Sequence, residues 1–88
     1  MRYEILITRR AKRQLEKLTW RVQEKVAEGI ARLGNDPFDQ ALDIKPLVND
    51  PVAQYRLRVG SYRVKFNRDD GIRIVEIMRV GHRREIYQ

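Results

Sequence analysis

Strict alternation of apolar and basic residues along two neighbouring stretches constrains the fold more than any other feature of the chain. The stretches are YRLRV (55–59) and YRVKFN (62–67), and Gly60 and Ser61 between them favour a tight reversal. Such a pattern predicts an antiparallel β-hairpin with one apolar face and one basic face. The basic face then carries four side chains, those of Arg56, Arg58, Arg63 and Lys65.

The first half of the chain has helical periodicity instead. Apolar residues at spacings of three and four predict two amphipathic helices, which a short turn at Thr19 joins into an antiparallel hairpin. Thr8 and Thr19 are the expected N-caps, and the segment GNDP (34–37) ends the second helix. The two apolar stripes are Ala11, Leu15 and Leu18, then Val22, Val26, Ile30 and Leu33.

Two more stretches are predicted strands. RYEILIT (2–8) is rich in strand-forming residues, and IRIVEIMRV (72–80) is apolar at most positions, as in a strand covered on both faces. The segment RDDG (68–71) favours a hairpin turn before the second of them. Residues 34–54 contain all 3 prolines, and we expect a long loop there.

The resulting order is strand, helix, helix, strand, strand, strand, which predicts a single α+β domain over residues 1–88. We expect the last three strands to form an antiparallel meander and the first strand to complete a four-stranded antiparallel sheet. The helical hairpin then covers the apolar face of that sheet, and the basic face is left open.

Composition excludes several classes of function. The chain has no cysteine and a single histidine, so disulfides are impossible and a protein-bound metal site is not expected. The only serine, Ser61, lacks a nucleophile-elbow motif. No apolar run approaches the roughly 20 residues that span a bilayer, and the first ten residues lack a secretory pattern. We therefore expect a cytoplasmic protein with no membrane partner, no metal and no cofactor.

Charge points to a polyanionic partner. The chain has 19 Lys and Arg against 12 Asp and Glu, a net charge of +7, and the excess is concentrated in residues 45–88. A basic surface of this kind favours nucleic acid, although acidic proteins and lipid headgroups are alternatives. Single exposed arginines often only keep a sheet solvated. Four on one face repel one another, and a phosphate backbone would relieve that repulsion.

The segment VGHRREIYQ (80–88) adds chemistry to this face. Arg79 precedes it as an isolated charge in an apolar strand and needs a partner or a ligand. His82 supplies an imidazole, the side chain that titrates near neutral pH. Arg83 and Arg84 supply two guanidinium groups, and Tyr87 supplies a ring that can stack on a base. These are the parts needed to hold a single RNA strand and cleave it.

Three segments together resemble the RelE toxins of the RelE/ParE superfamily: AKRQLEKL (11–18), YRLRVGSYRVKF (55–66) and VGHRREIY (80–87). The resemblance implies a microbial RNase-like fold and a toxin that cleaves mRNA in the ribosomal A site without a metal. In that chemistry the 2′-hydroxyl of the mRNA attacks the adjacent phosphate. The resemblance also implies three partners: an acidic RelB-like antitoxin, the ribosome with its mRNA and rRNA, and operator DNA through the antitoxin complex only.

The resemblance also implies roles for individual residues. Arg63 and Arg83 stabilise the charge of the phosphorane transition state, Tyr87 orients the base beside the scissile phosphate, and His82 is a candidate general acid or base. Some relatives carry lysines where this chain has arginines, and arginine is a poor general base. The expected phosphate-binding or rRNA-binding residues are Arg56, Arg58, Lys65, Arg79 and Arg84.

Two other readings of the same residues stay open. ParE-like toxins share the fold and inhibit DNA gyrase, but they generally lack a basic and aromatic tail such as HRREIY (82–87). A non-catalytic nucleic-acid-binding module would present the same charges and hold phosphates without cleaving them.

Overall fold

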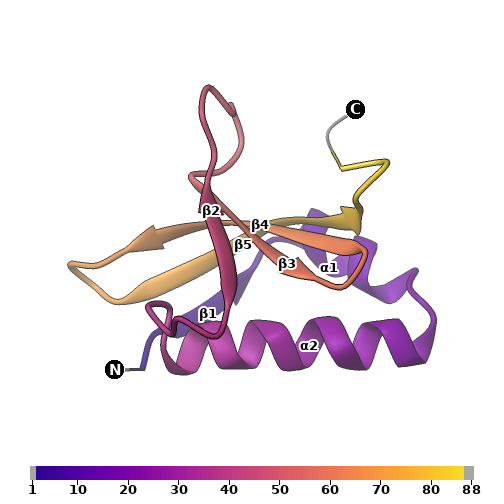
Figure 1. Ribbon diagram of the computed structural model, residues 1–88, viewed down its shortest axis with the longest axis horizontal. Coiled ribbons are helices and arrows are strands. Elements are labelled where there is room, and N and C mark those ends of the chain that lie inside the picture. Colours follow the sequence, from indigo (N-terminus) through magenta and orange to yellow (C-terminus); the bar gives the residue numbers. More distant parts are fainter. Residues whose placement is uncertain (1, 87–88) are drawn as a thin grey trace.

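The computed structural model describes residues 2–86 and contains two helices and five strands (Figure 1). Thr8 caps the first helix through its side-chain oxygen, which accepts a hydrogen bond from the backbone N–H of Ala11 at 3.1 Å. Both predicted helices and all four predicted strands are present. The elements are β1 (Glu4–Ile7), α1 (Arg9–Glu16), α2 (Trp20–Asn35), β2 (Asp43–Pro46), β3 (Tyr55–Val59), β4 (Tyr62–Asp69) and β5 (Ile74–His82).

The strands form one mixed sheet in the order β1-β5-β4-β3-β2. The predicted α+β class with two helices on a sheet is confirmed, but the prediction of four antiparallel strands is wrong in two respects. First, β2 adds a fifth strand from a segment expected to be loop, because Ile44 pairs with Leu57 and packs against the core. Second, β1 runs parallel to β5, because the helical hairpin carries the chain from the end of β1 across the sheet before the meander begins.

The core lies between the helices and one face of the sheet. Buried residues of α2, among them Val26 and Leu33, pack with Phe66 of β4 and Ile77 of β5. In Figure 1, α2 runs below the sheet, whereas the segment between β2 and β3 and residues 83–86 rise on the opposite side. We call the sheet face turned away from α2 the outer face. The segment between β2 and β3 and residues 83–86 cover part of this face, and a ligand can reach the remainder.

Membrane insertion finds no support in the helices. Within residues 2–86, neither helix is both long enough and apolar enough to span a bilayer. The longer helix, α2, has 16 residues and alternates buried positions with charged ones.

Candidate nucleic-acid interface

Strand register places the predicted basic residues side by side on the outer face. Arg56 pairs with Lys65, and Lys65 pairs in turn with Arg79, so these residues form a row across β3, β4 and β5. We call these three residues the cation row. One step along the strands, Arg58 pairs with Arg63, and Arg63 pairs with Gly81. Alternation therefore gave the correct grouping of the hairpin residues.

Two guanidinium groups meet at the turn between β3 and β4. The carbonyl oxygen of Gly60 accepts a hydrogen bond from Nη1 of Arg63 at 3.0 Å and another from Nε of Arg58 at 3.3 Å. Gly60 has φ of 58°, a conformation that favours glycine and turns its carbonyl into this position. Two like charges that share one acceptor repel each other, and an anion bound near this turn would reduce that repulsion.

Lys65 is engaged differently from the arginines of this face. Its Nζ lies 2.7 Å from Oδ2 of Asp50, and both side chains are about nine-tenths buried, with 8% and 12% exposed. The other carboxylate oxygen of Asp50 accepts from the backbone N–H groups of Val52 and Ala53. The hydrogen bond from Lys65 and that from Val52 lower the pKa of Asp50 to about 2. This buried ion pair fastens the segment 50–53 onto β4.

The cation row has a second ion pair at its other end. Nη1 of Arg56 lies 3.4 Å from Oδ1 of Asp43 in β2, whose side chain is 47% exposed. Because this carboxylate stays solvated and lies at the edge of the sheet, the ion pair is weak and leaves Arg56 able to bind another anion.

Residues 83–86 fold back on the end of the sheet. The backbone N–H of Arg83 donates to the carbonyl of Ser61 at 2.8 Å, and the N–H groups of Glu85 and Ile86 both donate to the carbonyl of His82. Ile86 lies over Gly81, where an added Cβ would be 3.6 Å from the Cβ of Ile86. Arg83 and Arg84 are exposed in this turn. The turn brings the backbone of Arg83 beside the β3–β4 turn that carries Arg58 and Arg63.

His82 lies on the other side of the strand from Arg63. It pairs with Tyr62, and the two rings meet edge to face with centroids 5.4 Å apart. Its Nδ1 accepts the backbone N–H of Arg84 at 3.2 Å. A neutral ring that accepts at Nδ1 carries its proton on Nε2. The strand register thus groups Arg58 with Arg63 on the outer face, whereas the side chain of His82 lies on the opposite face at the end of β5. Tyr87, the remaining predicted site residue, lies outside the described residues.

A hollow of about 760 Å³ lies along the edge of β5 that β1 leaves uncovered. We call it the basic hollow. Sequence reasoning expected Lys65, Arg79 and His82 in such a site. For Arg10 of α1 it left an rRNA contact and a solvated helix surface equally open, and it missed Lys17, the C-cap residue of α1; both line the hollow. Spacings of four and three residues on one helical face carried a signal for this wall. Its charged lining consists of four cations and two carboxylates, namely Arg10, Lys17, Lys65, Arg79, Asp50 and Glu85.

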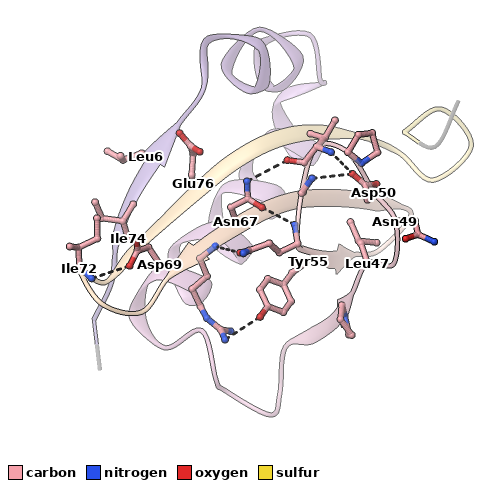
Figure 2. A pocket seen from close by; sticks show the side chains of 16 residues that line it. Leu6, Leu47, Asn49, Asp50, Tyr55, Asn67, Asp69, Ile72, Ile74 and Glu76 are labelled. Atoms are coloured by element: carbon pink, nitrogen blue, oxygen red, sulfur yellow. Dashed lines mark hydrogen bonds between the residues drawn. The ribbon is translucent and has the colours of Figure 1, made fainter.

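A second hollow of about 860 Å³ opens on the outer face near β1. We call it the apolar hollow. Figure 2 shows Leu6, Ile72 and Ile74 on one side of it and Leu47 on the other. Its charged lining is one cation, Arg68, with three carboxylates, Asp50, Asp69 and Glu76. The segment 50–52 borders both hollows.

Metal-ligating side chains are not grouped in the part of the chain that the structure describes. Among residues 2–86, no three His, Cys, Asp or Glu side chains lie close enough together to hold an ion. The charged groups that gather on the outer face and along β5 are mainly guanidinium and ammonium groups, which bind anions.

Comparison with known proteins assigns this arrangement to a family. A family model described as the ParE toxin of the type II toxin–antitoxin system parDE matches residues 5–87. Toxin RelG of Mycobacterium tuberculosis is 34% identical over 89 residues, which cover 100% of this chain and 99% of RelG. The chain belongs to the RelE/ParE superfamily of type II toxins. Toxin RelE of the same organism is 33% identical over 87 residues, covering 98% of this toxin and 87% of that RelE.

Solved structures of RelE proteins share the fold of this toxin. The toxin–antitoxin complex RelBE2 of M. tuberculosis contains a chain that is 31% identical, with a TM-score of 0.79 over 93% of this toxin and 99% of that chain. The archaeal RelE–RelB complex of Pyrococcus horikoshii has the same TM-score at 22% identity, over 97% of this toxin and 99% of that chain. The latter likeness supports the fold alone.

Proposed function

We propose that this toxin is a ribosome-dependent endoribonuclease that cleaves mRNA in the ribosomal A site and so inhibits translation. The single observation that carries the proposal is the shared hydrogen bonding of Arg58 and Arg63 to Gly60, beside the backbone of Arg83. This cluster is suited to an anion that carries more than one charge. The relatives named RelE and RelG support the same class of toxin.

The proposed reaction needs no group other than RNA, side chains and solvent water. The 2′-hydroxyl oxygen forms a bond to the adjacent phosphorus, the bond from phosphorus to the 5′-oxygen breaks, and a 2′,3′-cyclic phosphate and a 5′-hydroxyl result. The proton of the 2′-hydroxyl passes to solvent water, and the protonated ring of His82 supplies the proton that joins the 5′-oxygen. The phosphorane between these states carries an extra negative charge, and we assign its stabilisation to the guanidinium groups of Arg63 and Arg83. Metal independence is part of the proposal.

His82 is the proposed acid–base residue, and its hydrogen bond narrows the role. Because Nδ1 accepts from Arg84, the neutral ring has a donor and not an acceptor at Nε2. The neutral ring can donate a hydrogen bond to the RNA from Nε2, but to transfer a proton it must first gain one at Nδ1, which breaks the hydrogen bond from Arg84. We assign this proton-donating role to the protonated ring of His82, rather than removal of the 2′-hydroxyl proton. Tyr87 is proposed, from the resemblance to RelE toxins, to stack on the base beside the scissile linkage.

Phosphate binding is assigned to the remaining predicted cations. They divide into groups that are already engaged by carboxylates and groups that are not. Lys65 and Arg56 are held by Asp50 and Asp43, respectively. The other proposed phosphate-binding or rRNA-binding residues are Arg58, Arg79 and Arg84.

We propose an acidic RelB-like antitoxin as the partner that blocks this site. The similar solved structures include complexes of RelE with RelB, which supports a partner of that kind. The ribosome with its mRNA and rRNA is the proposed target. Operator DNA is a proposed ligand only of the toxin–antitoxin complex, since the charge of the toxin alone does not specify a sequence.

A translation reaction programmed with one defined mRNA tests the proposal. Primer extension should reveal a cut within the codon in the A site, and only when ribosomes are present. An absence of cuts in translating reactions contradicts the nuclease assignment.

Gyrase inhibition is the second candidate, because the matching family model is described as a ParE toxin. A supercoiling reaction with purified gyrase separates the two. Double-strand breaks in plasmid DNA would favour the ParE-like activity, whereas RNA binding with neither cut would favour a non-catalytic module.

A further inference from the structure

We propose that α1 forms the second wall of an RNA-binding groove, in which Arg10 and Lys17 bind phosphates of the strand that leads away from the cleaved linkage. The inference rests on the proposed function and names a binding surface for its RNA substrate. The surface is the basic hollow, and the residues that define it come from α1, β4 and β5.

The position of α1 follows from the strand order. β1 ends at Ile7, which pairs with Ile77, so the edge of β5 beyond Ile77 has no neighbouring strand. α1 occupies this edge instead, and Oε1 of Gln14 accepts the backbone N–H of Val80 at 2.8 Å. This hydrogen bond satisfies the backbone N–H of Val80, which has no strand partner on that edge. It also orients α1 so that the helix face carrying Gln14 points toward β5.

Arg10 and Lys17 lie on that same helix face. They are four residues before and three residues after Gln14, and all three line the basic hollow. Lys12 and Arg13 lie on the same helix, are exposed and do not line the hollow. The helix therefore has one set of cations directed into the hollow and another set directed to solvent.

The cations of this wall form no ion pair with the residues that the structure describes, although Asp50 and Glu85 also line the hollow. Among residues 2–86, no carboxylate lies within ion-pair distance of Arg10, Lys17 or Arg79. The first turn of α1 also has no acidic residue. Arg10 stands in that turn, where a cation interacts unfavourably with the helix dipole. An anion bound in the hollow would offset both costs.

RNA fits the hollow better than a small anion because the cations continue beyond it. The cation row runs across β3, β4 and β5 and reaches the edge of β5 at Arg79, where the α1 wall begins. Lys65 in the middle of the row is buried in its ion pair with Asp50, so a chain with a charge at every nucleotide would contact Arg79 and Arg56 on either side of it. An acidic protein segment is the competing occupant, and the test below separates it from RNA.

The test compares two charge-matched double variants of the full toxin. Arg10→Gln with Lys17→Gln removes two cations from the hollow, and Lys12→Gln with Arg13→Gln removes two cations from the solvent side of the same helix. The probe is a short fluorescent RNA with 2′-O-methyl sugars, which has no free 2′-hydroxyl to attack the phosphate and so cannot be cleaved by this chemistry. Binding is measured by anisotropy at several salt concentrations, and oligoglutamate is titrated as the acidic-protein probe.

The hollow variant should reduce the slope of log affinity against log salt by about 1.4, the value for two lost phosphate contacts on a single strand. The solvent-side variant should change the slope by less than half as much. Equal slopes for the two variants overturn the inference, because net charge alone then explains binding. Loss of oligoglutamate binding without loss of RNA binding overturns it in favour of an acidic protein.

Two further measurements keep the result interpretable. Arg79→Gln removes the facing cation from β5 and should lower the slope by about 0.7 without touching α1. Cleavage by the unaltered toxin in the translation reaction tests the proposed function separately. If the unaltered toxin cleaves mRNA and the two double variants bind RNA alike, the α1 wall is wrong and the nuclease assignment stands.

Discussion

The two hollows border the same segment, residues 50–52, yet they differ sharply in chemistry. The basic hollow has four cations and two carboxylates in its lining, whereas the apolar hollow has one cation, three carboxylates and several apolar side chains. The difference arises along the strands. On β5, Ile74 and Glu76 line the apolar hollow and Arg79 lines the basic one, within six positions. One face of a sheet can therefore carry an acidic and apolar surface and a basic surface when residues of opposite charge lie at different positions along the same strand.

The Lys65–Asp50 ion pair separates these surfaces. It fastens the segment 50–53 to β4 between the hollows and leaves Asp50 shared by both linings. The ammonium group of Lys65 and the carboxylate of Asp50, 2.7 Å apart, neutralise each other, so this ion pair adds little net charge to either hollow. The contrast on its two sides then depends on the arginines and the lysine of the basic hollow.

The largest expected effect is on the rate of mRNA cleavage, and it compares arginines near the β3–β4 turn with a residue of the apolar hollow. Arg83→Ala should lower the rate of mRNA cleavage by roughly 100-fold to 1,000-fold, the usual cost of losing one group that stabilises transition-state charge. Arg63→Ala should behave similarly. The matched control is Glu76→Gln in the apolar hollow, which should leave cleavage in the translation reaction unchanged. Equal toxicity of all three variants at equal expression would contradict the catalytic roles proposed for Arg63 and Arg83.

The next effect concerns the Lys65–Asp50 ion pair between the two hollows and is measured as a change in the free energy of unfolding. Asp50→Asn should lower the free energy of unfolding at pH 7 by about 3 kcal/mol, because it leaves a buried Lys65 without its charge partner. Urea denaturation measures this. The control is Asp43→Asn, whose partly exposed ion pair with Arg56 should be worth at most about 1 kcal/mol.

The same variant carries a pH prediction. The pKa of Asp50 is lowered from 3.8 to about 2 in the folded toxin, so its stabilisation is present above the unfolded value and is lost as the pH falls toward 2. The stability difference between the unaltered toxin and Asp50→Asn should therefore be constant near neutrality and shrink between about pH 4 and pH 2. A difference that persists at pH 2 would refute the role of the charge.

A smaller effect tests whether the position of residues 83–86, next to the β3–β4 turn, matters for cleavage. A Cβ at Gly81 would already be in van der Waals contact with Ile86, at 3.6 Å from its Cβ, so the larger side chain of Gly81→Leu would press its outer carbons against residues 83–86. We expect roughly tenfold slower cleavage, since small displacements of positioned groups are costly. Stability should change little because Gly81 lies on the outer face. Gly71→Leu, in the turn before β5, is the control at the far end of the sheet. Unchanged cleavage by Gly81→Leu would separate the tail from the reaction.

The smallest effect is expected in the apolar hollow. Ile72 is 67% exposed, so Ile72→Ser should alter the free energy of unfolding by less than about 0.5 kcal/mol. The salt dependence of RNA binding should not change either. A change in that slope would mean that RNA crosses segment 50–52 and occupies both hollows.

Local pattern was sufficient to predict the hairpin, both helices and the basic face, because alternation and helical spacing are properties of neighbouring residues. It was insufficient for β2, since DIKP (43–46) is too short to show a period and becomes a strand only through pairing with β3. The parallel partner of β1 was missed for a related reason: a period of two identifies a strand but not its neighbour.

The candidate site divides in the same way. Arg58 and Arg63 were grouped correctly because they lie on one hairpin. The ion pair of Lys65 with Asp50 was missed because it depends on the path of a loop 15 residues away in the sequence. The α1 wall was missed because helix periodicity shows which residues share a face, but not which part of the sheet that face meets.

The pairing of β1 with β5 has a consequence for biosynthesis. Glu4 and Ile74 are partners, and β5 is also the strand that joins β1 to the rest of the sheet. A growing polypeptide that has not yet reached β5 has no template for its first strand and no closed core. Such a nascent chain therefore lacks the folded sheet on which the proposed activity depends.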